Sequence, residues 1–144
     1  MIVVDTGVLV AAVNRRDRFH ASCAAFLDTA AEQLHVPTMV VTEVCYMLAR
    51  PGHGSPKLSA TFLDALAGEG LKVEGLTTQD LARMAELVRR YANLPLDAVD
   101  AAVVATAERL GTTKVATVDR KDFQIVVPAH CEAFHLLPIE LAYG

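Results

Sequence analysis

The chain has 144 residues, of which 53% are hydrophobic and 21% are charged. This composition is typical of a globular protein and excludes a disordered chain, and the length fits a single domain over residues 1–144. The net charge of −4 argues against a large basic surface for nucleic acid. It does not exclude an enzyme that acts on nucleic acid, because acidic side chains that hold divalent cations contribute to the same deficit.

No apolar run approaches the roughly 18–20 residues that a membrane-spanning helix needs, and Asp5 interrupts the N-terminal apolar stretch too early for a signal peptide. We therefore expect a cytoplasmic protein without membrane contact. The cysteines are odd in number and form no CxxC motif, which favours a reducing compartment. The pairs His20 with Cys23 and His130 with Cys131 match no standard zinc spacing.

The first part of the chain predicts two strands with two helices between them. Residues 2–4 form a short apolar strand, and residues 7–14 continue as a helix of about two turns. Residues 16–30 place their apolar side chains at helical spacing on one face. Residues 34–37 predict the second strand, which a proline closes.

The middle of the chain predicts two helices and a third strand. Residues 38–52 predict a helix with Thr38 as its N-cap, and residues 55–70 predict another with Ser55 as its N-cap. A loop rich in proline and glycine separates the two helices. Residues 71–76 read as a short strand.

The last part predicts two more helices and two more strands. Thr77 and Asp80 stand in capping-box register at the start of a helix over 76–92. The apolar face predicted for that helix consists of Leu81, Met84, Ala85, Val88 and Tyr91. A nearly all-apolar helix follows over 97–111, with strands at 113–119 and 133–138. Strands that alternate with helices predict an α/β fold whose parallel sheet is covered on both faces.

Four carboxylates lie in unusually apolar surroundings. Asp5 and Asp119 each follow a predicted strand, Glu43 lies one turn inside an apolar helix, and Asp100 lies in the first turn of another. Each has an ordinary alternative: the three aspartates suit helix caps or turns, and Glu43 suits a helix edge exposed to water. Together, the four positions suggest that these carboxylates converge, because strand ends and helix starts meet at one edge of a parallel sheet.

Carboxylates that converge at one edge repel one another unless cations lie between them. A site made only of carboxylate oxygens selects Mg²⁺ or Mn²⁺, and such a metal site suggests phosphoryl chemistry. The chain has no GxxxxGK[ST] loop and no GxSxG motif, which argues against a P-loop nucleotidase and against a serine hydrolase.

The segments IVVDTGVLVAAVNRRD, VPTMVVTEVCYML, LDAVDAAVVATAERLG and VATVDRKDF occur in this order. Together they resemble the PIN-domain ribonucleases, specifically the VapC toxins of bacterial VapBC toxin–antitoxin pairs, and the resemblance covers essentially the whole chain. It implies a PIN-like three-layer α/β/α sandwich with a short, mainly parallel central sheet. It also implies an endoribonuclease that depends on Mg²⁺ or Mn²⁺ and that inhibits translation or growth by cleaving RNA.

The resemblance implies four catalytic carboxylates, which are Asp5, Glu43, Asp100 and Asp119. The three aspartates among them would hold the metal. Asp122 is an alternative to Asp119, because the segment DRKD offers two acids, and Asp97 lies near enough in sequence to assist.

Other residues near these motifs are candidates for supporting roles. Thr6 and Thr117 adjoin acidic motifs and could orient the carboxylates. The family often has serine or threonine where this chain has Gly7, which leaves one supporting contact in doubt. Candidates for binding RNA phosphates, with solvated surface as the alternative, are Arg15, Arg16, Arg120 and Lys121.

The resemblance also implies a homodimer and a cognate VapB-type antitoxin. Such an antitoxin would lay an amphipathic segment along an apolar groove. Residues that could line this groove, although core packing explains them as well, are Val44, Met47, Leu48, Phe62 and Leu66.

Other classes of protein fit the sequence less well. A phosphoaspartate receiver needs an acidic pair after the first strand, and a phosphatase of similar topology needs a second aspartate two residues after the first; the segment DTG supplies neither. A catalytically silent PIN-like scaffold that binds RNA or protein stays open, although the four retained carboxylates argue against it.

Overall fold

The computed structural model describes residues 1–139 of the chain. Its sheet has five strands in the order β3-β2-β1-β4-β5, and each neighbouring pair is parallel. The strands are β1 (Ile2–Val4), β2 (Leu34–Pro37), β3 (Leu71–Glu74), β4 (Lys114–Ala116) and β5 (His135–Leu137). The parallel sheet predicted from the alternation of strands and helices is confirmed.

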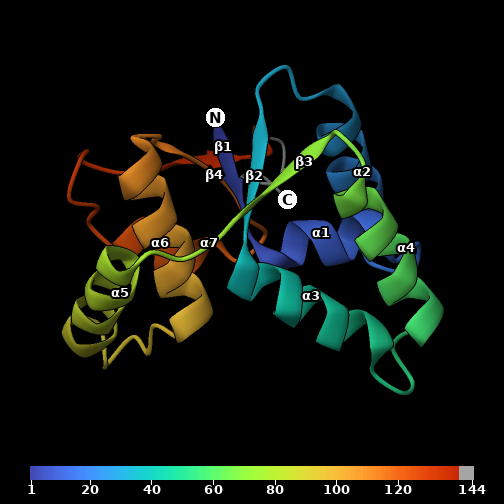
Figure 1. Cartoon of the computed structure of the whole chain (residues 1–144), viewed down its shortest axis with the longest axis horizontal. Coiled ribbons are helices and arrows are strands. Elements are labelled where there is room, and N and C mark those ends of the chain that lie inside the picture. Colours follow the sequence, from blue (N-terminus) through green and yellow to red (C-terminus); the bar gives the residue numbers. More distant parts are fainter. Residues whose placement is uncertain (140–144) are drawn as a thin grey trace.

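Helices cover both faces of this sheet (Figure 1). They are α1 (Thr6–Val13), α2 (His20–Thr29), α3 (Thr38–Ala49), α4 (Pro56–Ala67), α5 (Thr78–Arg90), α6 (Ala98–Leu110) and α7 (Arg120–Ile125). Helices α5 and α6 lie on one face, and α1, α2 and α4 lie on the other. Helix α3 leaves the carboxyl end of β2 and contacts α1, α4 and α6. The predicted three-layer α/β/α arrangement is therefore confirmed.

Helix α6 contains a long unbroken run of buried residues. Every residue from Ala101 to Ala107 is buried, and the helix packs against β1, β2 and β4. Its sequence is apolar on all sides because it lies between the sheet and α5. Gly111 ends it in the left-handed conformation, with φ of 72°. This packing fixes the position of its first turn, which carries Asp97 and Asp100.

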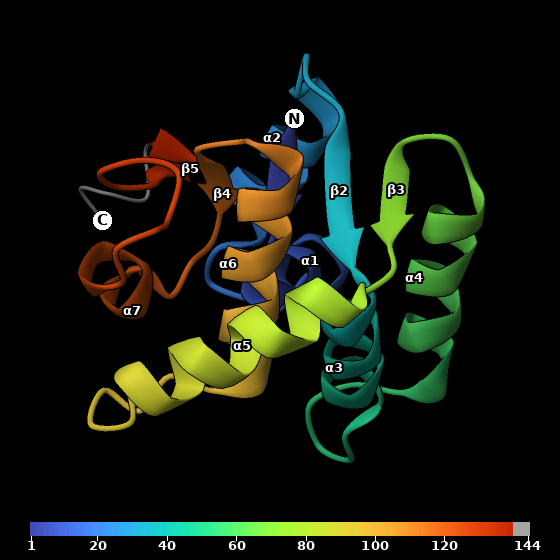
Figure 2. The same cartoon turned by 60° about the vertical axis from the view of Figure 1, so that its left-hand side comes forward.

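The carboxyl ends of the strands share one edge of the sheet. Figure 2 shows the arrowheads of β2 and β3 pointing to the edge at which α3 and α6 begin. Helix α1 begins directly after β1, and α7 begins a few residues after β4. Side chains at the starts of four helices are therefore brought to the same edge, as the sequence predicted for its carboxylates.

Two helix starts differ from the prediction. Helix α2 begins later than residue 16, because the Oδ1 of Asp17 accepts a hydrogen bond of 2.9 Å from the backbone N–H of Phe19 and holds a turn there. Thr38 is not the N-cap of α3: Pro37 takes that position. The Thr38 hydroxyl instead donates to the backbone oxygen of Glu74, 2.9 Å away on the next strand.

The apolar face predicted for α5 is partly wrong. Leu81 and Val88 are 53% and 36% exposed, whereas Asp80, Met84 and Leu87 are buried. The predicted capping box is confirmed, since the Thr77 hydroxyl and the Asp80 carboxylate each accept a backbone N–H at 3.0 Å. The Asp80 carboxylate also forms an ion pair with Arg109 of α6, whose Nε lies 3.0 Å from Oδ2. This ion pair turns the side of α5 that carries Asp80 toward α6.

Two further differences concern the C-terminal part. Strand β4 ends at Ala116, three residues earlier than predicted, although the backbone N–H of Thr117 still donates to the oxygen of Leu137 at 2.9 Å. Helix α7 was not predicted as a helix. It is short, and its buried Phe123 packs edge to face against Phe134 with ring centroids 6.4 Å apart.

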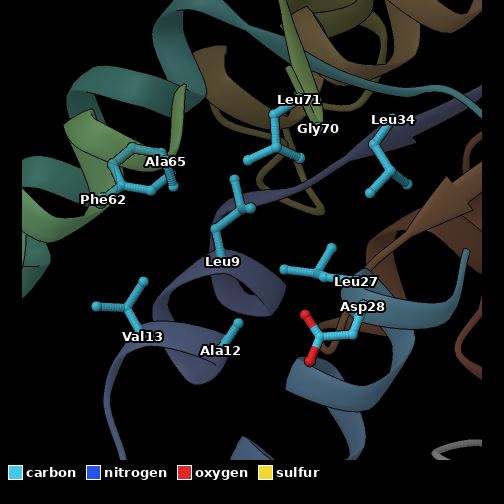
Figure 3. A pocket seen from close by; sticks show the side chains of 10 residues that line it. All are labelled: Leu9, Ala12, Val13, Leu27, Asp28, Leu34, Phe62, Ala65, Gly70 and Leu71. Carbon is cyan, nitrogen blue, oxygen red and sulfur yellow. The ribbon is translucent and has the colours of Figure 1, made fainter. Parts of the chain in front are cut away.

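Of the residues predicted to line an apolar groove, Val44, Leu48 and Phe62 are buried, and Met47 and Leu66 are partly buried against the core. Val44 and Leu48 are fully buried in the core, so the groove prediction was wrong for them. Phe62 lines an apolar pocket of about 270 Å³ that α1, α2 and α4 form over β2 (Figure 3). Leu9 projects into this pocket from α1, and Asp28 of α2 stands at its side. Within residues 1–139, no helix combines the length and apolarity that a membrane span requires.

Candidate functional site

Asp5 is buried at the point where β1 ends and α1 begins. It is 6% exposed and serves as the N-cap of α1, with its Oδ1 2.8 Å from the backbone N–H of Thr6. Its Oδ2 accepts a hydrogen bond of 2.9 Å from the Thr117 hydroxyl. Burial raises the pKa of Asp5 to about 6, and these two hydrogen bonds oppose the rise. Asp5 is thus both a cap and a destabilised carboxylate.

Asp100 lies in the first turn of α6, one turn after the N-cap Asp97. The Oδ1 of Asp97 accepts the backbone N–H of Asp100 at 2.8 Å, which leaves the Asp100 carboxylate unused by the cap. Burial, followed by the negative charges of Asp97, Asp5 and Asp122, raises the pKa of Asp100 to about 8. The capping-box role considered for Asp100 is therefore not the reason for its position.

The remaining acids act on these two through their charge. The carboxylates of Glu43 and Asp119 both raise the pKa of Asp5, and that of Asp122 raises the pKa of Asp100. Asp119 is the N-cap residue of α7, and Asp122 lies in its first turn. We call these side chains the acidic cluster: Asp5, Glu43, Asp97, Asp100, Asp119 and Asp122. Asp119 acts on Asp5 and Asp122 acts on Asp100, so both stay candidates for the fourth carboxylate of the site.

The two predicted threonines lie beside Asp5. Thr117 is fully buried and donates to Asp5, and its oxygen also accepts the backbone N–H of Asp119 at 3.2 Å. It therefore ties two members of the acidic cluster together. Thr6 is 4% exposed, and its hydroxyl has no hydrogen-bond partner in the described part of the chain. A buried hydroxyl without a partner is unfavourable, so this oxygen has unused capacity next to Asp5.

Val118 explains the glycine at position 7, and no local sequence pattern predicted this contact. A Cβ on Gly7 would lie 2.3 Å from Cγ2 of Val118, which is well inside van der Waals contact. The valine thus fills the space that a serine or threonine would need. Position 7 therefore supplies no hydroxyl, and Asp5 accepts a side-chain hydrogen bond from Thr117.

The four basic candidates do not form one group. Arg120 donates from Nε to the backbone oxygen of Thr117 at 3.3 Å and from a terminal nitrogen to the backbone oxygen of Pro138, so its side chain joins the ends of β4 and β5. Lys121 is exposed on α7. Arg15 and Arg16 lie beyond the C-terminal end of α1, and they line a cavity to which the acidic cluster contributes no residue.

The donor set of the acidic cluster fits a hard divalent cation. All of its ligating atoms are carboxylate oxygens, which Mg²⁺ and Mn²⁺ prefer. None of the six carboxylates forms an ion pair within residues 1–139. No three Asp, Glu, His or Cys side chains in this range stand close enough together to hold a metal as they are. The cluster therefore offers carboxylate oxygens of the kind that a divalent cation would use, and Asp5 and Asp100 are its members with a raised pKa.

The histidine and cysteine pairs have other partners. The Nδ1 of His20 lies 2.8 Å from the backbone oxygen of Ala11, and Cys23 is buried in the core. The Nε2 of His130 lies 2.7 Å from the backbone oxygen of Thr112. These contacts are structural and stand apart from the acidic cluster.

Comparisons with known proteins identify the family of this chain. The sequence matches the model of the PIN domain family over residues 2–127. It is 27% identical to Ribonuclease VapC26 of Mycobacterium tuberculosis over 95% of this chain and all of that protein.

Solved structures with the same fold include VapC20 of Mycobacterium tuberculosis, described as a toxin that cleaves the sarcin–ricin loop. It has a TM-score of 0.73 and 19% identity, over 80% of this chain and 87% of that one. A toxin–antitoxin complex from Klebsiella pneumoniae has a TM-score of 0.65 and 20% identity, over 88% and 92% of the two chains. The match to the family over most of its length, together with this fold, shows that the chain belongs to the PIN domain family.

Proposed function

We propose that this protein is an endoribonuclease that depends on Mg²⁺ or Mn²⁺ and is the toxin of a type II toxin–antitoxin pair. The observation that carries the proposal is the acidic cluster, in which burial and mutual repulsion raise the pKa of Asp5 and of Asp100. Within residues 1–139, neither carboxylate forms an ion pair. Similarity to Ribonuclease VapC26 supports RNA as the substrate. Growth would then be inhibited through the cleavage of RNA needed for translation.

The residues in and beside the acidic cluster would have different roles. Asp5, Asp100 and Asp119 would hold the metal, and Glu43 would join them directly or through water. A bound divalent ion supplies an acidified water and neutralises charge on a phosphate. Thr117 orients Asp5 through its hydrogen bond of 2.9 Å. Asp97 keeps the first turn of α6 closed, so that the carboxylate of Asp100 stays free for the metal.

An antitoxin partner follows from the same similarity, because solved neighbours of this fold include a toxin–antitoxin complex. The apolar pocket that Phe62 lines is the place we propose for an apolar side chain of such a partner (Figure 3). A homodimer is supported by large apolar side chains left exposed on two helices, namely Tyr46 of α3 and Leu81 and Val88 of α5.

The proposal is tested by incubating the purified protein with total RNA and with Mg²⁺, with Mn²⁺ or with EDTA. We expect cleavage with either metal and none with EDTA. Asp100→Asn should reduce cleavage by on the order of 100-fold or more, because a metal ligand contributes several kcal/mol to the transition state. Its melting temperature without metal should be equal to or above that of the wild type, since the variant removes like-charge repulsion.

Asp64→Asn is the matched control, because Asp64 is exposed on α4, away from the acidic cluster. It should cleave as the wild type does. Full activity of the Asp100→Asn variant, or cleavage that survives EDTA, would contradict the proposal. A wild-type protein that binds RNA but leaves it intact with both metals would favour the silent binding scaffold.

A further inference from the structure

A polar cavity of about 500 Å³ opens where the loop after α1 meets the loop before α4. Arg15, Arg16 and His53 contribute their side chains to its lining. A smaller hollow of about 180 Å³ adjoins it, since it shares Asn14 and His53 and adds Arg50. We call the two together the basic pocket. None of its residues belongs to the acidic cluster.

The basic pocket concentrates positive charge in an acidic protein. Residues 14–18 and 50–58 together contain five arginines or lysines and one aspartate, whereas the whole chain has a net charge of −4. Arg15, Arg16 and Arg50 form no ion pair within residues 1–139, unlike Arg83 and Lys114, which pair with glutamates. Unpaired arginines around a concave surface are complementary to an anion.

Both loops of the basic pocket are held in place by the protein itself. The backbone N–H of Arg16 donates to the side chain of Asn14 at 3.1 Å, and that of Gly54 donates to the oxygen of Arg50 at 2.9 Å. A Cβ on Gly54 would lie 1.9 Å from the backbone oxygen of Leu48, so only glycine allows this approach. A pocket whose walls are fixed beforehand loses little conformational entropy when it binds a ligand.

The basic pocket lies at the far end of the two helices that start at the acidic cluster. Figure 1 shows α1 and α3 side by side, both running away from the sheet edge. Helix α1 starts after Asp5, and its eight residues span about 12 Å. On α3, Glu43 and Arg50 are separated by about 10 Å. A strand that carries evenly spaced negative charges can therefore reach from one to the other.

We propose that the basic pocket binds a backbone phosphate of the RNA substrate, at least one nucleotide away from the phosphate held at the acidic cluster. The inference rests on the proposed function and adds a second anchoring point to it. RNA fits better than an acidic protein segment, because a metal-loaded acidic cluster attracts a phosphate at one end while the arginines attract another. Arginine also suits phosphate through paired N–H···O contacts.

The first test measures binding in a protein that cannot cleave. Asp100→Asn is titrated against a fluorescently labelled, ten-nucleotide single-stranded RNA with Mg²⁺, alone and combined with Arg15→Gln and Arg16→Gln. We expect the two arginine substitutions to raise Kd about tenfold. They should also make the plot of log association constant against log salt concentration less steep by about 1.4, the value for two lost phosphate contacts on a single strand. Arg89→Gln with Arg90→Gln removes the same charge from the exposed end of α5 and should change Kd by less than about twofold.

The second test uses cleavage and substrate length. With position 100 unchanged, Arg15→Gln with Arg16→Gln should raise KM for the ten-nucleotide RNA and leave kcat nearly as it is. A dinucleotide is too short to reach both sites, so the variant and the wild type should cleave it equally well. A variant that merely disturbed the acidic cluster would lose kcat on both substrates.

Decaglutamate is titrated under the same conditions as a probe for an acidic protein segment. Three results would overturn the proposal: an unchanged Kd for RNA, an equal effect of the Arg15/Arg16 and Arg89/Arg90 double substitutions, or loss of decaglutamate binding with unchanged RNA affinity. The last of these would assign the pocket to an acidic protein segment. Melting temperatures show whether each variant folds, and Arg16→Gln alone replaces the double variant if it does not. Failure of the proposed function is separate, because it appears as a wild type that does not cleave RNA, whereas the first test measures only the RNA affinity of Asp100→Asn and its arginine variants.

Discussion

Asp5 shows at the scale of one residue how a cap and a functional carboxylate can be the same side chain. A cap explains its bond to the N–H of Thr6, but it does not explain its burial or its second bond to Thr117. A capping role alone is satisfied at the surface, where the charge keeps its hydration. The buried position therefore has a cost that the fold must offset, and a bound cation is the partner that would offset it.

This cost predicts how stability depends on pH in the absence of metal. The pKa of Asp5 is raised from 3.8 to about 6 in the folded protein. A raised pKa means that the contribution of Asp5 to stability is fully present below pH 3.8 and is lost as the pH rises through 6. At pH 8 the charged side chain therefore opposes folding.

Asp5→Asn should accordingly stabilise the protein in EDTA at pH 8, by about 1–2 kcal/mol, while keeping a good N-cap. The difference from the wild type should shrink as the pH approaches 4. Urea unfolding at pH 4.5, 6 and 8 measures it, with Asp64→Asn as the variant whose effect does not change with pH. A wild type more stable than Asp5→Asn at pH 8 would mean that Asp5 has a partner that offsets its burial without metal.

Helix α5 shows at the scale of an element how one ion pair decides which face is buried. Its apolar residues fit two adjacent helical stripes, one through Leu81 and Val88 and the other through Met84 and Leu87. The buried stripe begins with Asp80, because this residue closes the capping box and binds Arg109 of α6. The second stripe is left exposed and supports the proposed self-association.

Leu87→Ala and Leu81→Ala form a matched pair that tests this orientation. Leu87→Ala should lower the free energy of unfolding by about 2–5 kcal/mol, since it leaves a cavity in the core. Leu81→Ala should change it by less than about 0.5 kcal/mol in dilute protein. Chemical denaturation measures both, and a larger loss from Leu81→Ala would show that the stripes are reversed. An effect of Leu81→Ala that grows with protein concentration would support the dimer.

At the scale of the whole molecule, charge is separated along the direction of α1 and α3. The acidic cluster stands where these helices begin, and the basic pocket stands where they end. A net charge of −4 conceals this separation, because the two regions partly cancel in the sum. A net charge of −4 therefore excludes a large basic face, but it does not exclude one basic pocket the size of a phosphate.

Metal binding at the acidic cluster should be visible in the unfolding of the whole domain. At pH 8, Mn²⁺ at about 100 times its Kd adds about 2.7 kcal/mol to stability, which raises the melting temperature of a chain of this size by about 5–10 °C. At pH 5 the increase should be much smaller, because protons compete with the metal for Asp5 and Asp100. Thermal scans of the wild type and Asp100→Asn measure it. An equal shift in both proteins would place the metal elsewhere.

The sequence by itself determined the class of fold and singled out the acids of the candidate site. Apolar strands alternating with helices allow only a parallel sheet covered on both faces, and this holds whatever the side chains at each contact. Asp5, Glu43 and Asp100 stood out for a related reason: a single charge in an apolar segment needs an explanation. The capping box at Thr77 was also local, and it was confirmed.

Only the tertiary structure decided what depends on residues far apart in the sequence. The buried face of α5 follows from Arg109, 29 positions after Asp80. The absence of a side chain at Gly7 follows from Val118. The basic pocket joins two loops between which all of α2, β2 and α3 intervene. Local patterns report caps and periodicity, whereas pairings across the fold depend on how the layers pack, and no single segment carries that information.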